Sequence, residues 1–432
     1  MIGSDFMLFK IELNTDNSYK ALGLFLRVYR IQAGYSLRDL GFITNISHTL
    51  IANIEKGKVA GSDGTLKDLF TSLNVPYYDT TNLEEEFKEG YDKIFDFLYK
   101  YNYTRATIEM NKLMENEEIY RHSSLITDYA LIKFFYLVLL GHEAKDKYIS
   151  IHVLKKVARN FNARQKQLFY LIEGIDFYNQ GLFSDSKEKL DLALKLGVSH
   201  LDYLTKVFLV KCYVKMFRFM DVISVGNQAI DFFENHIVYL RAMEVRLSIA
   251  YSYMLLRKFK ESQLLLDSVS QFSNNFNAMY LIEESNILLA ALYIYTSRIN
   301  EAREMLGKIQ KSGPTEYFLK LRVAVRDGDL EDVKTLYEKY KSDDTFTKSR
   351  SQEIAMNITV REIGIINMSE IEFIDEINEL IDTGIRSSDI EVIDSSYNYL
   401  IRHYKKKRMY KKALEASEKA RDYRRYGVLK HN

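Results

Sequence analysis

An internal repeat constrains this chain more than any other feature of its sequence. Four segments align with one another at nearly regular intervals, and their first residues are Phe183, Phe219, Phe259 and Ile299. The aligned segments are residues 183–193, 219–229, 259–269 and 299–309, with further copies at 330–340 and 410–420 and a weaker copy at 103–113. Repeats of this length cannot bury an apolar face alone, so successive units are expected to stack on one another.

The repeats are predicted to be helical. From residue 80 onward the apolar residues follow the period of an amphipathic helix and never the alternation of a strand. Only two prolines, Pro76 and Pro314, occur in 432 residues, so little interrupts helix formation. An aromatic residue lies near the end of the helix that precedes most copies: Phe177, Tyr213, Tyr253, Tyr293 and Tyr404.

This pattern resembles the tetratricopeptide repeat, a pair of helices with small residues where the two helices touch. Fitting small residues are Gly174, Ala193, Ala250, Ala290, Ala302, Ala413 and Ala420. The proline that usually ends such a repeat is absent, so these copies are degenerate. The expected fold class is all-α, with residues 89–432 forming a tetratricopeptide-like α-solenoid that has a concave inner surface.

Residues 1–76 are predicted to form a separate bundle of four short helices, at residues 19–32, 37–43, 48–56 and 65–73. Ser36 and Ser47 are good N-cap residues for the second and third helices. Gly34 and Gly57 are suited to end the first and third. Two short helices joined by a tight turn within a compact bundle form a helix-turn-helix motif. Residues 77–88 are predicted to be a linker.

The N-terminal motif resembles the Xre/Cro family of DNA-binding domains over most of residues 19–76. The matching stretches are Gly34-Tyr-Ser-Leu-Arg-Asp-Leu40 and Ile46-Ser-His-Thr-Leu-Ile-Ala-Asn-Ile-Glu-Lys-Gly57, with family core positions at Leu40, Ile46, Ile51 and Ile54. Two positions depart from the family pattern. Leu37 stands where glutamine is frequent, and Gly41 stands where alanine is usual, which suggests a tight helix crossing.

The resemblance implies that the third helix reads a double-stranded DNA operator in the major groove. Its base-facing positions would be His48, Thr49 and Asn53, because an asparagine amide can pair with adenine through two hydrogen bonds. The other implied DNA-binding residues are the cap Ser47 and three cations near phosphates, Arg38, Lys56 and Lys58. Residues 19–76 hold seven basic and four acidic side chains, a net charge of +3 in a chain whose total is +1.

The complete architecture resembles the RRNPP quorum-sensing family of peptide-responsive regulators. Members bind a short signalling peptide on the concave surface of the repeats and usually act as homodimers. The repeat frame predicts a peptide-binding face at Tyr178, Asn179, Lys211, Lys215, Glu244, Tyr251, Tyr295 and Arg322. Amide side chains can clamp a peptide backbone, tyrosine rings supply rigid contact area, and the cations can meet a carboxylate.

Two functional hypotheses remain open from the sequence. In the first, the protein is a transcription regulator whose repeats bind a signalling peptide and thereby change DNA binding. In the second, the repeats form an interaction scaffold for a protein partner and the N-terminal bundle does not read DNA. A basic run from Arg402 to Lys412 is interpreted as a solvated helix face, with non-specific phosphate contacts as the alternative.

No catalytic site, metal site or cofactor is expected. The sequence has no glycine-rich phosphate loop, no Gly-x-Ser-x-Gly segment and no Cys/His spacing typical of a metal site. No uncharged apolar run reaches the length of a membrane span, and residues 1–20 lack the layout of a signal peptide. The single cysteine, Cys212, suits a reducing compartment. A cytoplasmic, non-enzymatic protein is therefore expected.

Overall fold

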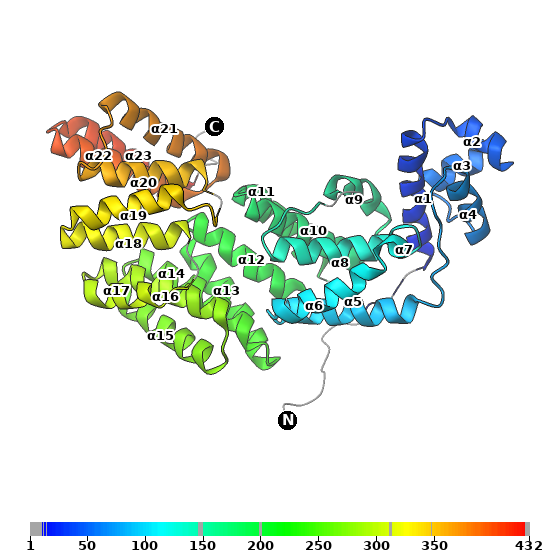
Figure 1. The fold of residues 1–432 in the computed structure, drawn as a ribbon, viewed down its shortest axis with the longest axis horizontal. Coiled ribbons are helices and arrows are strands. Elements are labelled where there is room, and N and C mark those ends of the chain that lie inside the picture. The colour runs from blue at the N-terminus through cyan, green and yellow to red at the C-terminus, as the bar shows by residue number, and fades with distance from the viewer. Residues whose placement is uncertain are drawn as a thin grey trace. The chain divides into compact units, whose positions relative to one another are not determined.

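The computed structural model describes residues 11, 13, 15–145, 150–197, 201–310, 313–346 and 348–427, and this part of the chain is helical (Figure 1). It contains 23 α-helices and one 3₁₀ helix, Ala158–Asn160 (η1), and the described residues form no strand. The predicted all-α class is confirmed. Much of the segment on which the signal-peptide expectation rests lies outside the described residues. Within them, no helix combines the length and apolar character needed to cross a membrane.

Contacts between Cα atoms divide the chain into two compact units, with a boundary between Phe208 and Leu209 and with Gly181–Ser184 assigned to the second unit. The first unit contains α1 (Thr15–Gln32), α2 (Leu37–Thr44), α3 (His48–Glu55), α4 (Asp63–Ser72), α5 (Glu84–Tyr99), α6 (Tyr103–Glu115), α7 (Glu117–Arg121), α8 (Ile126–Leu139), α9 (Ile151–Val157), α10 (Ala163–Asn179) and most of α11 (Phe183–Leu196). Helix α12 (Leu201–Lys215) crosses the boundary. The predicted domain limits at residues 76 and 88 are not tested by this division and stay predictions.

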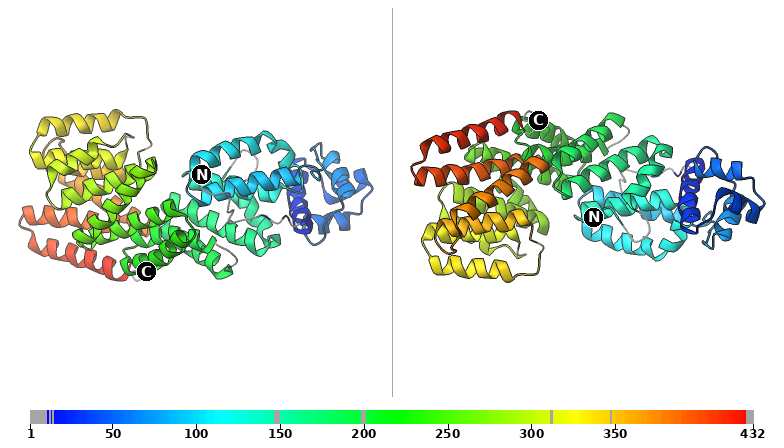
Figure 2. Two further views of the ribbon diagram at one scale, coloured as in Figure 1. Left: turned by 90° about the horizontal axis from the view of Figure 1, so that it is seen from below. Right: turned by 90° about the horizontal axis from the view of Figure 1, so that it is seen from above.

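The second unit continues with α13 (Phe219–Asn235), α14 (Tyr239–Leu255), α15 (Phe259–Asn275), α16 (Met279–Tyr295), α17 (Ile299–Gly307), α18 (Pro314–Asp327), α19 (Leu330–Ser342), α20 (Arg350–Glu362), α21 (Glu370–Ser387), α22 (Ile390–Lys406) and α23 (Tyr410–Tyr426). Successive helices pack against one another as antiparallel pairs (Figure 2). Each of the seven aligned segments begins a helix at its first residue, so the repeat frame is confirmed. The alignment missed one pair, α20 and α21.

One recurring turn joins the helices of a pair. Three residues separate the helices, and the middle one has a left-handed backbone, as at Phe217, Arg257 and Ser297 with φ of 54°, 59° and 62°. The N–H of the third residue donates to the carbonyl of an aromatic residue five positions earlier. These bonds are Arg218 to Tyr213 at 2.9 Å, and Lys258 to Tyr253, Arg298 to Tyr293 and Met409 to Tyr404 at 2.8 Å each. This is the Schellman bond that ends a helix abruptly.

The same turn explains the aromatic residues that recur in the sequence. The cation of the third turn residue lies over the ring, with Arg218 4.6 Å from the Tyr213 centroid and Arg298 4.3 Å from that of Tyr293. A guanidinium at this distance is attracted by the face of the ring. The tyrosines therefore fix the turn through a backbone carbonyl and a side-chain face together.

Small residues set the spacing of the paired helices, as the sequence predicted. Ala250, Ala290 and Ala302 are fully buried. At Gly174 a methyl group would come within 2.7 Å of Leu190 on the partner helix. A serine hydroxyl on the second helix donates to the carbonyl of the small residue on the first, from Ser186 to Gly174 at 2.7 Å and from Ser262 to Ala250 at 2.8 Å.

The left-handed turn residues provide a direct test of the backbone argument. Arg257 is exposed and adopts φ of 59°, a conformation that costs an L-residue roughly 1–2 kcal/mol but costs glycine little beyond its own chain entropy. Arg257→Gly is expected to raise the free energy of unfolding by about 0.5–1 kcal/mol, measured by urea unfolding of the full chain. Arg257→Ala, which keeps the strain and removes the same charge, serves as the control. Equal stability of the two variants would contradict the argument.

Candidate functional site

In the N-terminal bundle, helix α3 exposes the residues of its first turn. Ser36 and Asp39 form a reciprocal capping box at the start of α2, and the Ser47 hydroxyl accepts the N–H of Leu50 at 3.2 Å at the start of α3. Gly34 and Gly57 have φ of 76° and 62°, as predicted for the glycines that end helices. Helix α1 begins earlier than predicted, at Thr15, and α3 ends at Glu55 rather than at residue 56.

Helix α4 also begins earlier than predicted, at Asp63 rather than residue 65. The physical reason is Ser62, whose hydroxyl caps α4 by accepting the N–H of Thr65 at 3.3 Å. Asp63 and Gly64 are weak helix formers and are common in turns, so nothing in the sequence indicated that the helix starts before residue 65. Once capped, they form the first turn of the helix.

Two close backbone approaches fix how α3 lies in the bundle. A methyl group at Gly23 of α1 would come within 2.3 Å of the Ile54 carbonyl, and one at Gly41 of α2 within 2.8 Å of the Ile46 carbonyl. Both sites therefore require glycine. The tight helix crossing predicted from Gly41 is confirmed, while Gly23 was not recognised from the sequence.

A buried ion pair joins α1 to the end of α3. The Arg30 guanidinium donates to both carboxylate oxygens of Glu55, at 2.5 and 2.8 Å, and to the carbonyl of Tyr35 at 2.7 Å. Its hydrogen bonds to Glu55 raise the pKa of Arg30 against the opposing effect of burial. Glu55 was recognised only as part of the helix-end signal, but it anchors α3 to the bundle.

The predicted DNA-binding residues lie on the outside of this bundle. Arg38, Ser47, His48, Thr49, Lys56 and Lys58 are exposed, and Asn53 is half-buried. Leu40, Ile51 and Ile54 face inward and are fully buried, which matches their predicted core role, while Ile46 is only partly buried. The carbonyl of Lys56 also accepts a 2.6 Å hydrogen bond from Arg159, so the end of α3 contacts the first helical repeats.

The Arg30–Glu55 pair is expected to be required for the bundle. Glu55→Ala would leave the Arg30 charge buried and unpaired, a change that costs about 3–5 kcal/mol. Hydrogen exchange of α1–α4 amides in the full chain measures this cost, because it reports the local opening of one part of a large protein. The exposed Asp68→Ala variant removes the same charge from the same bundle and should leave exchange nearly unchanged. Matching exchange rates in the two variants would disprove the anchoring role.

In the second unit, charged and tyrosine side chains converge from the first helices of successive pairs. We call this set the inter-repeat cluster. Its members are Lys211, Lys215, Arg241, Glu244, Tyr251, Glu284, Tyr295, Arg322, Asp389 and Glu391. They come from α12, α14, α16, α18 and the start of α22, and none comes from the second helix of a pair. The first helices therefore share one polar face.

Glu244 is the central carboxylate of one half of the cluster. It is almost fully buried and forms ion pairs with Lys211 and with the fully buried Arg241, each at 2.6 Å. Burial alone would raise the pKa of Glu244, but the two cations outweigh it and lower the pKa. Glu284 lies beside them on the exposed side of the cluster. The protein around its carboxyl partly removes water from it, and this effect, with the charge of Glu244, raises the pKa of Glu284 against the effect of Lys211.

Glu391 is the central carboxylate of the other half. Lys215 lies 2.9 Å from Glu391 and 3.7 Å from Asp389, and the Tyr251 hydroxyl donates to Glu391. Burial and the Glu391 charge raise the pKa of Tyr251. Asp389 caps α22 by accepting the N–H groups of Glu391 and Val392. These contacts link α12 and α14 to α22 across 176 and 140 residues of sequence.

Apolar packing supports the same long-range contact. Phe217, which follows α12, packs against the hydrophobic core formed by α20–α23. Tyr295 and Arg322 extend the cluster along α16 and α18, with the guanidinium 5.5 Å from the Tyr295 ring centroid and 5.8 Å from that of Phe318. The first repeats of the second unit therefore lie against the last.

Six of the eight residues predicted for the peptide-binding face belong to this cluster: Lys211, Lys215, Glu244, Tyr251, Tyr295 and Arg322. Glu244 is buried beneath the face rather than exposed on it. Tyr178 and Asn179 lie in the first unit, where Asn179 donates to the Val138 carbonyl at 2.8 Å and Tyr178 packs 6.4 Å from Phe208. Sequence reasoning missed Arg241, Glu284, Asp389 and Glu391.

No group of metal-ligating side chains occurs in the described part of the chain, and Cys212 is buried as a small apolar residue. The inter-repeat cluster is composed of ion pairs and tyrosine hydroxyls. Such an arrangement can recognise a polar ligand by charge and hydrogen bonding.

Solved structures share this helical-repeat fold. A Rap protein in complex with Competence and Sporulation Factor aligns with 79% of this chain and 98% of its own, with a TM-score of 0.64 and 11% identity. The apo quorum sensor NprR from B. thuringiensis aligns with 79% of this chain and 99% of its own, with a TM-score of 0.53 and 15% identity. NprR with its cognate peptide NprX aligns with 73% and 96%, with a TM-score of 0.54 and 15% identity.

These likenesses establish the fold. No protein-family model matches the sequence, and a sequence search of curated proteins finds no significant match. Of these neighbours, NprR is described as a quorum sensor, and the Rap protein and one NprR structure are complexes with a factor and a cognate peptide.

Proposed function

We propose that this protein is a cytoplasmic transcription regulator that binds a DNA operator as a homodimer and responds to a short peptide. Helix α3 reads the operator, and the inter-repeat cluster binds the peptide. The protein acts by binding and not by catalysis. The observation that carries the proposal is the presence of both parts in one chain: an exposed, capped helix in a four-helix bundle and a polar face formed by successive first helices.

The DNA-reading role is supported by what α3 exposes. His48 and Thr49 lie on the first turn of the helix, directly after the Ser47 cap, and carry polar groups outward. The helix itself is rigidly held through Gly23, Gly41 and the Arg30–Glu55 pair. A recognition helix in the major groove contacts bases mainly through residues near its N-terminus. Arg38, Lys56 and Lys58 add exposed cations for phosphate contacts.

The peptide-binding role is supported by the inter-repeat cluster and by the neighbours. Two of the neighbouring structures are complexes, one of a Rap protein with Competence and Sporulation Factor and one of NprR with its cognate peptide NprX. In this chain, Glu284 and Tyr295 are solvent-exposed members of the cluster, next to the buried Glu244 network. Fixed charges of both signs can meet the termini and polar side chains of a short peptide.

A protein partner is the second candidate ligand of the repeats. Exposed apolar side chains gather where α13 leads into α14 and α15 into α16, at Ile237, Tyr239, Phe276, Met279 and Tyr280. Phe272 and Phe276 stack at 4.5 Å, and Tyr239 lies edge-on to Phe272 at 6.2 Å. Contiguous exposed apolar surface is typical of protein contacts. This surface fits a second copy in the homodimer or a separate protein in a scaffold.

The first test is selection of DNA sites from a random duplex pool by the purified full chain. Wild type is expected to enrich a motif with two half-sites, since a dimer reads both. The His48→Ala, Asn53→Ala double variant should lose it, because each well-formed base contact contributes about 1–3 kcal/mol of discrimination. Lys67→Ala and Asp68→Ala on α4 are the controls. If no motif is enriched by wild type at low salt, the scaffold hypothesis replaces DNA reading.

The second test is affinity selection from a random library of short peptides. The Glu284→Ala variant should bind the enriched sequence about tenfold more weakly, because a charge-assisted contact is lost. Glu304→Ala on the second helix α17 removes an exposed carboxylate outside the cluster and should not change the affinity. Enriched peptides that bind wild type and both variants equally would place the peptide elsewhere and refute a role for the cluster.

A further inference from the structure

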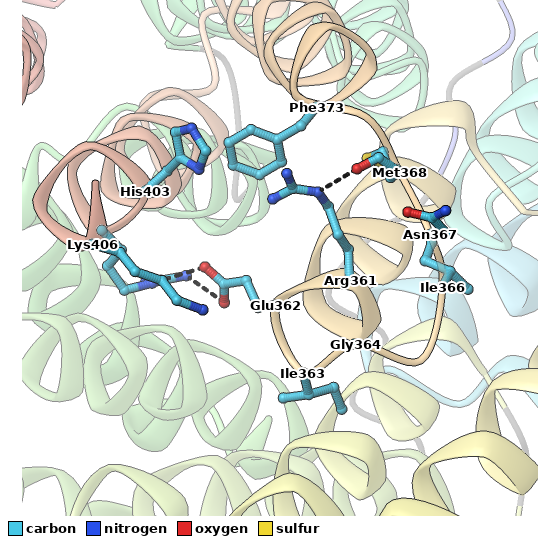
Figure 3. Close-up of a pocket in the computed structure, with 11 residues that line it drawn as sticks. Arg361, Glu362, Ile363, Gly364, Ile366, Asn367, Met368, Phe373, His403 and Lys406 are labelled. Carbon is cyan, nitrogen blue, oxygen red and sulfur yellow. Dashed lines mark hydrogen bonds and ion pairs between the residues drawn. The ribbon is translucent and has the colours of Figure 1, made fainter. Parts of the chain in front are cut away.

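A second polar site lies among the last repeats, away from the inter-repeat cluster. It is a cavity of about 770 Å³ between the end of α20, the loop that follows it and the end of α22. Its polar lining is Arg361, Glu362, Asn367, Arg402, His403 and Lys406 (Figure 3). A volume of this size matches that of a small-molecule site.

Arg361 is held in place while its terminal nitrogens stay available. Its Nε donates to the Met368 carbonyl at 3.1 Å, and its guanidinium carbon lies 4.2 Å from the centroid of the fully buried Phe373 ring. Figure 3 shows the guanidinium projecting into the space that His403 and Lys406 border from α22. Within the described residues, no hydrogen bond engages its two terminal nitrogens. A fixed guanidinium fork is suited to bind an oxyanion through two parallel hydrogen bonds.

The cavity carries an excess of positive charge. Arg361, Arg402 and Lys406 line it together with one carboxylate, Glu362, so the lining has a net charge of +2 with a neutral histidine. Glu362 is already engaged, because Arg402 donates to both of its oxygens at 3.2 and 3.3 Å. Like charges gathered in one cavity repel one another unless an anion is present.

Neighbouring residues add to this positive charge rather than cancel it. The basic run continues through Lys405, Lys407 and Arg408 into α23. The nearby Glu370 contacts both Lys407 and His403, and hydrogen bonds from these two groups lower the pKa of its carboxyl. Glu370 is therefore also paired. The sequence suggested that this run is a solvated helix face. That interpretation does not explain why Arg361, which belongs to α20, lies beside the cations of α22.

Part of the cavity lining is apolar. Ile363, Ile366, Met368 and Phe373 contribute to it beside the cations. The lining thus combines cationic groups from α20 and α22 with hydrocarbon side chains. Free phosphate would fill a small part of this volume and would leave these apolar side chains without a contact.

From this geometry we propose that the cavity binds a small organic phosphate, with the phosphate dianion between Arg361 and Lys406 and the organic part against the apolar side chains of the lining. Arg361 supplies the bidentate contact, and Lys406 supplies a point charge from the opposite side. The +2 charge of the lining matches a dianionic phosphate better than a single carboxylate. This inference does not depend on the proposed function.

The test is isothermal titration calorimetry of the full chain with adenosine monophosphate, inorganic phosphate and adenosine. Adenosine monophosphate is expected to bind at least about tenfold more tightly than either of the other two, since only it contacts both the cations and the apolar side chains of the lining. Lys406→Gln should weaken its binding about tenfold, and Arg361→Gln should weaken it further. Lys419→Gln on α23 removes an exposed lysine that does not line the cavity and should leave affinity unchanged.

The outcomes separate the possible explanations. Because Arg361 packs on Phe373, the Arg361→Gln variant could lose stability, but Lys406 is exposed and its variant tests the site without that difficulty. Binding of inorganic phosphate as tightly as adenosine monophosphate would overturn the organic part of the proposal. Absence of binding by all three probes at millimolar concentration, or equal binding by Lys406→Gln and Lys419→Gln, would overturn the site itself.

Discussion

The recurring turn between paired helices is the constraint on which the repeats depend. A left-handed residue followed by a bond to the carbonyl five residues earlier ends one helix within a single turn and starts the next. The second helix must then run back along the first. The same geometry occurs at Phe217, Arg257, Ser297 and Arg408, so in these four pairs the second helix returns along the first in the same way. The first helices of successive pairs consequently share one face.

Because the first helices share one face, charged side chains from successive pairs can neutralise one another while they are buried. Arg241 and Glu244 have almost no solvent access, so each would carry a large desolvation penalty if it were alone. Lys211 from the preceding pair completes the network, and Lys215 forms a comparable pair with Glu391 at the other end of the unit. Buried ion pairs contribute little net stability compared with apolar packing. Their effect is on position, since each charge is satisfied only when specific pairs of helices lie at the right distance.

The sequence predicted local structure well and long-range contacts poorly. The helix starts at Phe219, Phe259 and Ile299 and the caps Ser36 and Ser47 follow from nearest neighbours in the chain, so periodicity and capping rules located them. Glu391, by contrast, required knowledge of contacts across 140 and 176 residues of sequence, which no repeat frame supplies.

Other misses have local physical causes. Gly23 was overlooked because glycine within a helix usually signals weakness, whereas here a carbonyl from α3 occupies the space of a side chain. The pair α20 and α21 was missed because α21 begins at the polar segment Ser369-Glu370 and not at the aromatic or aliphatic residue that starts the other second helices.

Within the first unit, the helical repeats contact the end of α3 directly. Arg159, in η1 between α9 and α10, places its guanidinium on the carbonyl of Lys56 at 2.6 Å, where the negative end of the α3 dipole attracts a cation. Beside it, a methyl group at Gly57 would meet the Asn160 amide within 2.1 Å, so the surfaces already touch. Helix α1 also contacts α8, α9 and η1.

A change in the position of η1 could therefore not leave α3 unaffected. It would have to break the Arg159 hydrogen bond or move the end of α3 with it. A ligand can shift such an equilibrium only by the difference between its affinities for the two arrangements. For the proposed peptide response, the peptide must therefore bind the repeats with different affinities when the Arg159 contact is intact and when it is broken. That requirement, and not the distance between sites, defines what a regulatory ligand of this fold must do.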